Sequence, residues 1–181
     1  MTTYGASNLP SQNTYYWDSC SWIGLLNQES GKYPALSAIW QHAKAGRCKI
    51  LTSTISRVEV LKKKCDGQDA MALSSQQNLE ISKMFQQPHV VMANVDLVVA
   101  TKAAELRMQH RELKKTPDAI HLATAMHWNC DAMHTYDKND LLSLNGKIRR
   151  RDGVLLDIET PDRAGLGPLF SQASSEDDER I

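Results

Sequence analysis

The chain has 181 residues, which suits one domain of ordinary size with a proper hydrophobic core. Apolar residues make up 41% of it and charged residues 23%, the composition of a soluble globular protein, and no apolar run approaches the roughly 20 residues of a membrane span. The formal net charge is zero, and the N-terminus lacks the basic start and apolar centre of a secretory signal, so we expect a cytoplasmic protein without membrane segments.

Hydrophobic patterning along the chain predicts strands that alternate with helices. Short apolar runs, typical of buried strands, cover 14–17, 48–52, 89–93, 131–135 and 154–158. Apolar side chains at helical spacing cover 21–28, 33–45, 56–64, 72–85, 95–109 and 118–128. This alternation favours an α/β fold in which a parallel sheet has helices on both faces.

The two ends of the chain fall outside this pattern. Residues 1–13 form an N-terminal lead and 14–159 the expected folded domain, while 160–181 lack apolar periodicity, so we expect a loose acidic tail. Because the last eight residues hold four acids and one base, residues 1–173 carry 20 basic and 17 acidic side chains. The folded part is therefore mildly basic.

Basic side chains cluster at three places along the chain. Such clusters can meet a phosphate backbone, or they can simply be solvated helix faces and loop ends. The clusters are Lys62–Lys64, Arg111 with Lys114 and Lys115, and Lys147 with Arg149–Arg151.

The cysteines give no sign of a metal site or of a disulfide framework, because no two of them lie at zinc-ligand spacing. We expect them to be buried thiols. They are Cys20, Cys48, Cys65 and Cys130.

Acidic residues recur where predicted strands end or helices begin. Asp18 follows the first strand, Glu59 lies about one turn after the second, Asp118 opens a helix, and Asp137 follows the strand at 131–135. In open α/β sheets the ligand site lies outside the carboxyl ends of the strands. We therefore expect these carboxylates to converge on one rim of the sheet.

The first two acids also have local structural explanations. Asp18 can cap the helix that follows it, because a carboxylate accepts hydrogen bonds from the free amides of the first turn. Ser56 and Glu59 fit the S-x-x-E pattern of a capping box. Either role would need no shared site.

The last two acids have local explanations as well. Asp118 follows Thr116, a candidate cap, and Pro117, a typical first helical residue, and a negative charge there gains roughly 0.3–1 kcal/mol from the helix dipole. Asp137 can start a turn with Asn139. It is the joint occurrence of all the acids that favours a common function.

Carboxylates brought to one rim repel one another unless cations neutralise them. Ligation by oxygen alone suits Mg²⁺ and Mn²⁺ and disfavours zinc. One or two such ions, about 3.5–4 Å apart in two-metal sites, activate a water and stabilise a phosphoryl transition state. The sequence therefore points to metal-dependent hydrolysis of phosphodiester bonds.

The segments that carry these acids resemble the PIN-domain ribonucleases, especially the VapC-like toxins of prokaryotic toxin–antitoxin pairs. They read DSC at 18–20, TSTISRVEV at 52–60, TPDAIHLATAM at 116–126 and HTYDKNDL at 134–141, and the resemblance extends over 14–158. It implies a PIN-like α/β/α sandwich around a central parallel sheet and Mg²⁺- or Mn²⁺-dependent cleavage of RNA. It also implies an antitoxin partner and a homodimer.

The resemblance further implies a catalytic, metal-binding quartet of Asp18, Glu59, Asp118 and Asp137. Asp18 and Asp118 are the expected direct ligands, with Glu59 and Asp137 holding a second ion or bound waters. Asp140 is the alternative for the fourth acid, and Asp137 is favoured because it lies nearer the strand end.

The sequence gives less specific indications of the roles of residues beside the acids. Ser19 and Thr135 resemble the hydroxyl residues that flank the family's site, although local backbone hydrogen bonds explain them equally well. His121, one helical turn after the third acid, is expected to be an exposed surface histidine and not a general base. The aromatic residues at 15–17 and Trp22 are expected to belong to the core.

The chain also departs from the VapC-like pattern. It is longer than those toxins, with the N-terminal lead, an extra segment around 66–79 and the acidic tail, so a toxin role stays open. Two other functions remain: a structure-specific DNA nuclease, and a non-catalytic PIN-like module that binds RNA or serves as a scaffold. A missing acid would have favoured the second of these, and none is missing.

Overall fold

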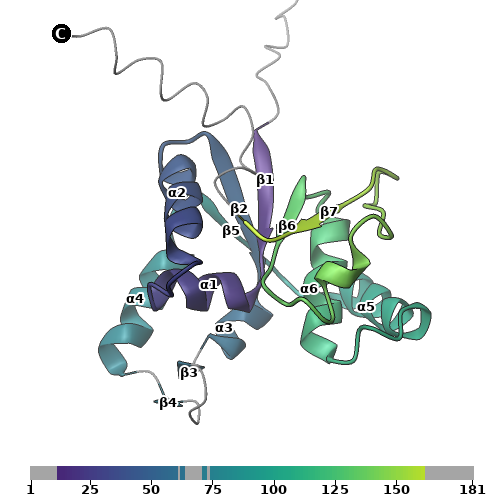
Figure 1. Cartoon of the computed structure of the whole chain (residues 1–181), viewed down its shortest axis with the longest axis horizontal. Helices are drawn as coiled ribbons and strands as arrows, with labels where there is room; N and C mark the ends of the chain where they lie inside the picture. The colour runs from purple at the N-terminus through teal and green to yellow at the C-terminus, as the bar shows by residue number, and fades with distance from the viewer. Residues whose placement is uncertain (1–11, 61, 64–70, 73, 162–181) are drawn as a thin grey trace, which may run out of the picture.

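A five-stranded parallel sheet forms the centre of the molecule (Figure 1) in the computed structural model, which describes residues 12–60, 62–63, 71–72 and 74–161. The sheet order is β5-β2-β1-β6-β7, and every pairing is parallel. The predicted parallel sheet is therefore confirmed, and the carboxyl ends of its strands share one edge. The strands are β1 (Asn13–Trp17), β2 (Cys48–Ser53), β5 (Val90–Ala93), β6 (Ala132–His134) and β7 (Asp157–Glu159).

Helices cover both faces of this sheet, which confirms the expected α/β/α sandwich (Figure 1). One face carries α1 (Ser19–Leu26), α2 (Tyr33–Lys44) and α4 (Ser75–Phe85), and the other carries α5 (Leu97–Gln109) and α6 (Thr116–His127). Two short elements follow strands: α3 (Ile55–Glu59) comes after β2, and the 3-10 helix η1 (Leu142–Leu144) comes after β6.

Strand β1 anchors both layers of the core. Successive side chains of a strand point to opposite faces, so Tyr16 packs with Leu122 on the α5 and α6 side, while Trp17 packs with Trp22 on the α1 and α2 side. Tyr16, Trp17 and Trp22 are buried, as predicted, and burial of each such side chain contributes about 1.5–3 kcal/mol. This two-sided anchoring fixes the position of Asp18, the next residue along the chain.

The helix predicted over 56–64 is wrong beyond Glu59. Lys62–Lys63 (β3) instead pair with Met71–Ala72 (β4) as a two-stranded antiparallel sheet. Backbone pairing with the segment at 71–72 overrides the local helical spacing here, because propensity is only a weak guide to structure.

Two further boundaries differ from the sequence prediction. The helix predicted from residue 72 begins at Ser75, where Ser74 and Gln77 form a capping box. The last strand begins at Asp157 and not at residue 154, because Leu155 forms an antiparallel bridge with Arg149 before the chain joins the sheet.

Several expectations concern residues at the margins of the structure. The lead at 1–13 and the tail at 160–181 lie almost wholly outside the described residues, as does Cys65. Cys48 and Cys130 are buried thiols, as predicted, but Cys20 is exposed on α1. None of the helices within the described ranges has the length and apolar character that a membrane crossing requires.

Candidate metal centre at the carboxyl edge of the sheet

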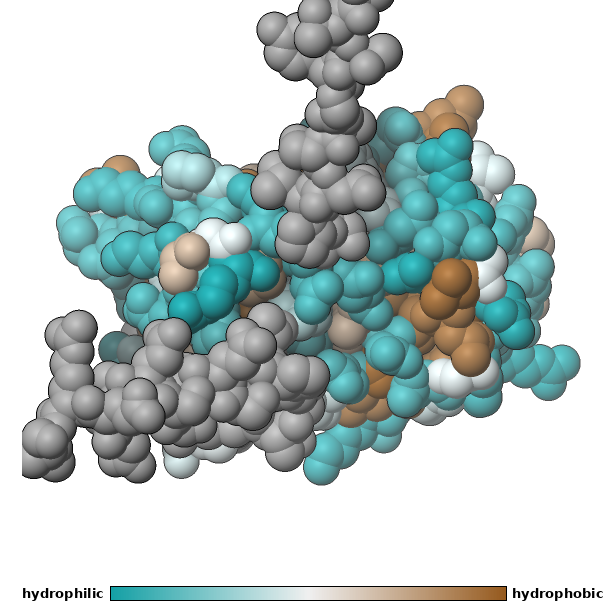
Figure 2. Space-filling model, turned by 90° about the horizontal axis from the view of Figure 1, so that it is seen from above, coloured by the Kyte–Doolittle hydropathy of each residue, from teal (hydrophilic) through white to brown (hydrophobic). Residues whose placement is uncertain are grey.

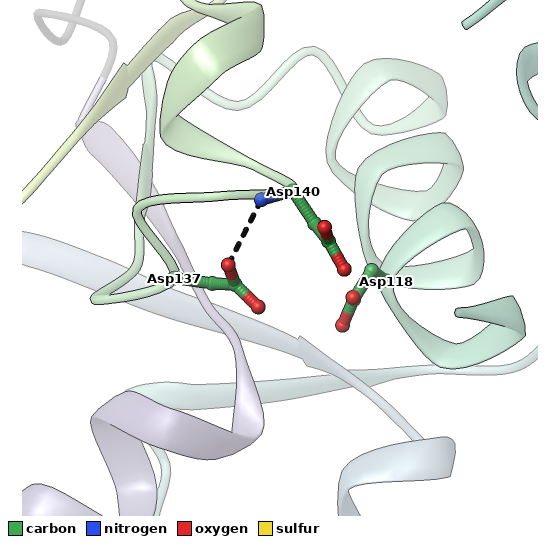
Figure 3. A group of neighbouring side chains, drawn as sticks. All are labelled: Asp118, Asp137 and Asp140. Carbon is green, nitrogen blue, oxygen red and sulfur yellow. Dashed lines mark hydrogen bonds between the residues drawn. The ribbon is translucent and has the colours of Figure 1, made fainter. Parts of the chain in front are cut away.

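Three aspartates meet where α6 begins and the loop after β6 passes beside it (Figure 3). Asp118, Asp137 and Asp140 each offer one carboxylate oxygen, and these oxygens lie within 4.8 Å of one another. We call this group the aspartate triad. It joins the expected third acid with both of the residues considered for the fourth.

The loop holds Asp137 through its own backbone. Asp137 Oδ1 accepts hydrogen bonds from the amides of Asn139 at 3.0 Å and of Asp140 at 2.9 Å, the latter drawn in Figure 3. The predicted turn is therefore confirmed. It does not compete with a metal-binding role, because the turn uses Oδ1 and leaves Oδ2 pointing toward the other acids.

Lys115 supplies a cation to all three aspartates. Its Nζ lies 2.9 Å from Asp137 Oδ2, 3.2 Å from Asp140 Oδ2 and 3.5 Å from Asp118 Oδ2. The sequence prediction treated this lysine only as part of a basic cluster. The signal was its position three residues before Asp118, since residues at that spacing are neighbours on a helix surface.

The pKa values of two acids of the triad, Asp118 and Asp137, are shifted in opposite directions. Burial, with repulsion from Asp137 and Asp140, raises the pKa of Asp118 to about 6 despite the nearby Lys115. Burial acts in the same direction on Asp137, but hydrogen bonds from the Asp140 amide and from Lys115 outweigh it and lower the pKa of Asp137. The hydrogen bond to Asp137 and the other two carboxylates raise the pKa of Lys115, which therefore stays charged.

Asp118 lies in the first turn of α6, where the helix dipole favours its charge as predicted, but its side chain does not cap the helix. The helix α6 begins after Lys115 with no side-chain cap, so the expected cap at Thr116 is wrong, and the Thr116 hydroxyl accepts from Arg107 instead. Asp118 Oδ2 is buried and has no hydrogen-bond partner within the described residues, and only the ion pair with Lys115 reaches it. Buried polar groups normally have partners, so an orphaned carboxylate oxygen suits a bound cation.

Asp18 lies at the end of β1 and outside the aspartate triad. It is 3% exposed, and its Oδ1 accepts from the Ser21 amide and hydroxyl, so its predicted helix-capping role is confirmed. Its Oδ2 accepts from the Thr135 hydroxyl. Burial raises the pKa of this carboxyl. Both oxygens are thus held by donors of the protein itself.

Glu59 ends α3 and faces α1 and α6. Its Oε2 accepts from the Ser19 hydroxyl and lies 2.7 Å from His121 Nε2. The capping box expected for Ser56 and Glu59 is wrong, because α3 begins before Ser56 and the Ser56 hydroxyl bonds to Thr52. Glu59 is not a member of the triad either.

His121 is buried, at 2% exposure, so its predicted surface position is wrong. Its Nδ1 lies 2.6 Å from the Tyr16 hydroxyl, which also accepts from the Ser53 amide. These contacts fit an arrangement in which Tyr16 donates to Nδ1 and Nε2–H donates to Glu59, with Ser19 Oγ 3.3 Å from the same Nε2. This chain of hydrogen bonds extends from the core to the rim, and it fixes the Glu59 carboxylate.

The side chains of the triad fit a hard divalent cation. All three offer carboxylate oxygens, the ligand type that Mg²⁺ and Mn²⁺ prefer, and the three carboxylates already surround the positive charge of Lys115. Asp18 and Glu59 lie at the same edge of the sheet and bring further carboxylates to the rim, each fixed by neighbouring hydroxyl groups.

Solved structures with the same fold include a toxin and a toxin–antitoxin complex. VapC20 of Mycobacterium tuberculosis, described as a sarcin-ricin loop cleaving toxin, is 16% identical, with a TM-score of 0.55 over 75% of this chain and 98% of its own. A toxin–antitoxin complex from Klebsiella pneumoniae is 21% identical, with a TM-score of 0.55 over 82% and 98%. VapBC2 of Rickettsia felis, bound to a promoter DNA fragment, is 15% identical, with a TM-score of 0.54 over 82% and 99%.

Sequence comparison extends the likeness from the fold to the family. No curated protein sequence matches the chain. The sequence profile of the PIN domain, however, matches residues 15–146, a stretch that contains all five acids of the rim. Since that match covers most of the chain, the protein belongs to the PIN-domain family.

Proposed function

We propose that this PIN domain is a cytoplasmic, metal-dependent endoribonuclease and the toxin of a toxin–antitoxin pair. The observation that carries the proposal is the aspartate triad, whose three carboxylate oxygens lie within 4.8 Å of one another at the carboxyl edge of the sheet. Ligands of open α/β sheets bind at that edge. Family membership adds support, because PIN domains include hydrolytic nucleases.

Asp118, Asp137 and Asp140 are the residues that would hold the ion. Bound there, Mg²⁺ or Mn²⁺ supplies an activated water and stabilises the charge that develops on the phosphoryl group. In this proposal Asp137 and Asp140 both act at the fourth position, because Lys115 lies within 3.2 Å of an oxygen of each.

Asp18 and Glu59 would complete the acidic rim and orient waters or a second ion. Ser19 and Thr135 serve as positioning residues in this proposal, since each donates a hydrogen bond to one of these carboxylates. His121 orients Glu59 and carries no proton for the reaction, because its ring is buried between Glu59 and Tyr16.

A protein partner is the second part of the proposal. The face seen from above is mostly hydrophilic, with apolar surface gathered on the side of α5, α6 and β7 (Figure 2). On α5, Leu97 is 82% exposed and borders a groove of about 790 Å³ between α5, α6 and Arg149–Arg151. Exposed apolar patches mark interaction sites, which supports an antitoxin partner or a homodimer.

The decisive test is a cleavage assay on RNA, with single- and double-stranded DNA run beside it. We expect cleavage of RNA in Mg²⁺ or Mn²⁺, loss of cleavage in excess EDTA, and recovery with either of those ions but not with Ca²⁺. Cleavage that persists in EDTA would refute the metal mechanism. Cleavage of DNA alone would leave the nuclease assignment intact and refute the choice of RNA.

A further inference from the structure

The ammonium of Lys115 lies where a cation bound by the triad would lie. Its Nζ is within 3.5 Å of one oxygen of each of Asp118, Asp137 and Asp140, and the same three residues form the candidate metal site. A divalent ion that shares these oxygens would be in close contact with the ammonium. Like charges at such a distance repel strongly in a partly buried site, so the two cations cannot occupy the centre together.

The Lys115 side chain is far more exposed to solvent than the acids around it, so it can leave the site more easily than they can. Its side chain is 61% exposed, whereas Asp118 is 15% and Asp140 8% exposed. It lies at the residue before α6, outside the helix, and carries a flexible stem of methylene groups. Withdrawal of the ammonium into solvent therefore requires only side-chain rotation.

The net charge of the site favours replacement of the Lys115 ammonium by a divalent ion. Three carboxylates and one ammonium leave an excess of negative charge at the aspartate triad, and a divalent ion compensates more of it than lysine does. Without any cation the same carboxylates would repel one another, so the lysine keeps the empty site assembled.

We propose that Lys115 is a built-in counter-ion of the metal site: it holds the three aspartates together in the metal-free protein and is displaced when a divalent metal binds. This inference rests on the proposed function, because it assigns the metal to the aspartate triad. Metal affinity is then set by competition with the lysine as well as by the acids.

The first test measures Mn²⁺ binding without RNA, from the electron paramagnetic resonance signal of free Mn²⁺. We expect Lys115→Met to bind Mn²⁺ about tenfold more tightly than the parent, the effect that a partly screened ion-pair network can supply. Lys115→Arg keeps the charge and should bind like the parent. Lys114→Met is the matched control, because the Lys114 ammonium forms no ion pair with the described residues, and it should leave the affinity unchanged.

The second test compares melting temperatures with and without metal. Metal-free Lys115→Met should melt below the metal-free parent, because the carboxylates lose their counter-ion. At saturating Mn²⁺ this difference should vanish or reverse, since the lysine no longer contributes to the metal-bound protein. A merely structural ion pair would lower the melting temperature equally in both states.

The outcomes separate this inference from the proposed function. Equal Mn²⁺ affinity in the parent and in Lys115→Met would overturn the counter-ion role and leave the metal site standing. A melting deficit that persists at saturating Mn²⁺ would overturn it as well. Absence of Mn²⁺ binding in both proteins would overturn the inference and the proposed metal site together, whereas binding by Lys115→Met alone would support the exchange.

Discussion

Asp18 and Asp118 lie at the same edge of the sheet, one after β1 and the other at the start of α6, but the protein holds them differently. Both oxygens of Asp18 accept hydrogen bonds from Ser21 and Thr135. Asp118 has a buried oxygen without a hydrogen-bond partner among the described residues, and the exposed Lys115 ammonium lies 3.5 Å from it. Local hydrogen bonds thus fix one carboxylate, while the other keeps an oxygen available for a ligand.

The same contrast separates Glu59 from the loop acids. Glu59 is held by Ser19 and by the buried His121, whereas Asp137 and Asp140 share the ammonium of Lys115. A hydrogen-bonded carboxylate resists displacement, and a salt-bridged one exchanges its partner more easily because solvent and ions compete for it. Substitutions in the aspartate triad should therefore affect activity most, whereas substitutions around Asp18 and Glu59 should affect stability most.

The largest effect is expected at Asp118. Asp118→Asn keeps the size of the side chain but removes its charge, so RNA cleavage at saturating Mg²⁺ should fall roughly a hundredfold or more, given that metal stabilisation is worth several kcal/mol. The measurement is kcat/KM for parent and variant. Asp96→Asn is the control, because Asp96 caps α5 by accepting from Val99 and Asn caps equally well. Full activity in Asp118→Asn would remove this residue from the site.

A smaller loss is expected at each of the loop acids. Asp137→Asn and Asp140→Asn should each reduce kcat/KM by about tenfold, because each shares the cation with its neighbour and removal of one leaves the other in place. Asn at position 137 can still accept from the amides that form the turn, so the loop should keep its shape. Loss in Asp140→Asn alone would assign the fourth acid to Asp140.

Around Asp18 and Glu59, which hydrogen bonds hold in place, a substitution should lower stability and leave metal binding unchanged. Tyr16→Phe leaves the Ser53 amide and His121 Nδ1 without their buried partner, which costs about 1–3 kcal/mol of unfolding free energy. We expect a melting temperature lower by about 2–4 °C per kcal/mol, with the Mn²⁺ affinity unchanged. Tyr33→Phe is the control, since the Tyr33 hydroxyl makes no hydrogen bond with described residues. A weaker Mn²⁺ affinity in Tyr16→Phe would show that these residues and the aspartate triad are coupled.

The smallest effect concerns pH in the metal-free protein. The pKa of Asp118 is raised to about 6, so the folded protein binds this proton more tightly than the unfolded chain does. Stability contributed by Asp118 is therefore present at low pH and falls as pH rises from about 4 to about 6. Metal-free Asp118→Asn should melt roughly 2–5 °C above the parent at pH 7, less than the full shift implies because solvent screens the charge.

Melting curves at several pH values check this expectation. The difference between Asp118→Asn and the parent should shrink toward pH 4, where the parent carboxyl is protonated in the folded protein. A variant that melts below the parent at pH 7 would contradict the crowded-charge description of the triad.

The local hydrophobic pattern of the sequence correctly predicted the layers of the fold. Apolar runs and helical spacing predicted the parallel sheet and the α/β/α sandwich, because burial of one face imposes a period of two on strands and of 3.6 on helices. They failed at 62–63 and 71–72, where the two segments pair with each other as an antiparallel sheet. They also failed for His121, since a helix packed on all sides shows little polarity in its sequence.

The sequence by itself determined which acids reach the rim, because Asp18 follows β1, Asp137 lies in the loop after β6, and Asp118 lies in the first turn of the helix that precedes β6. Only the tertiary structure decided which acids surround Lys115 as the aspartate triad and which are held by hydrogen bonds from other side chains. The contacts from Thr135 to Asp18, from His121 to Glu59 and from Lys115 to Asp137 join residues 117, 62 and 22 positions apart. Local spacing carries no information about such contacts, because the path of the chain between the elements sets them.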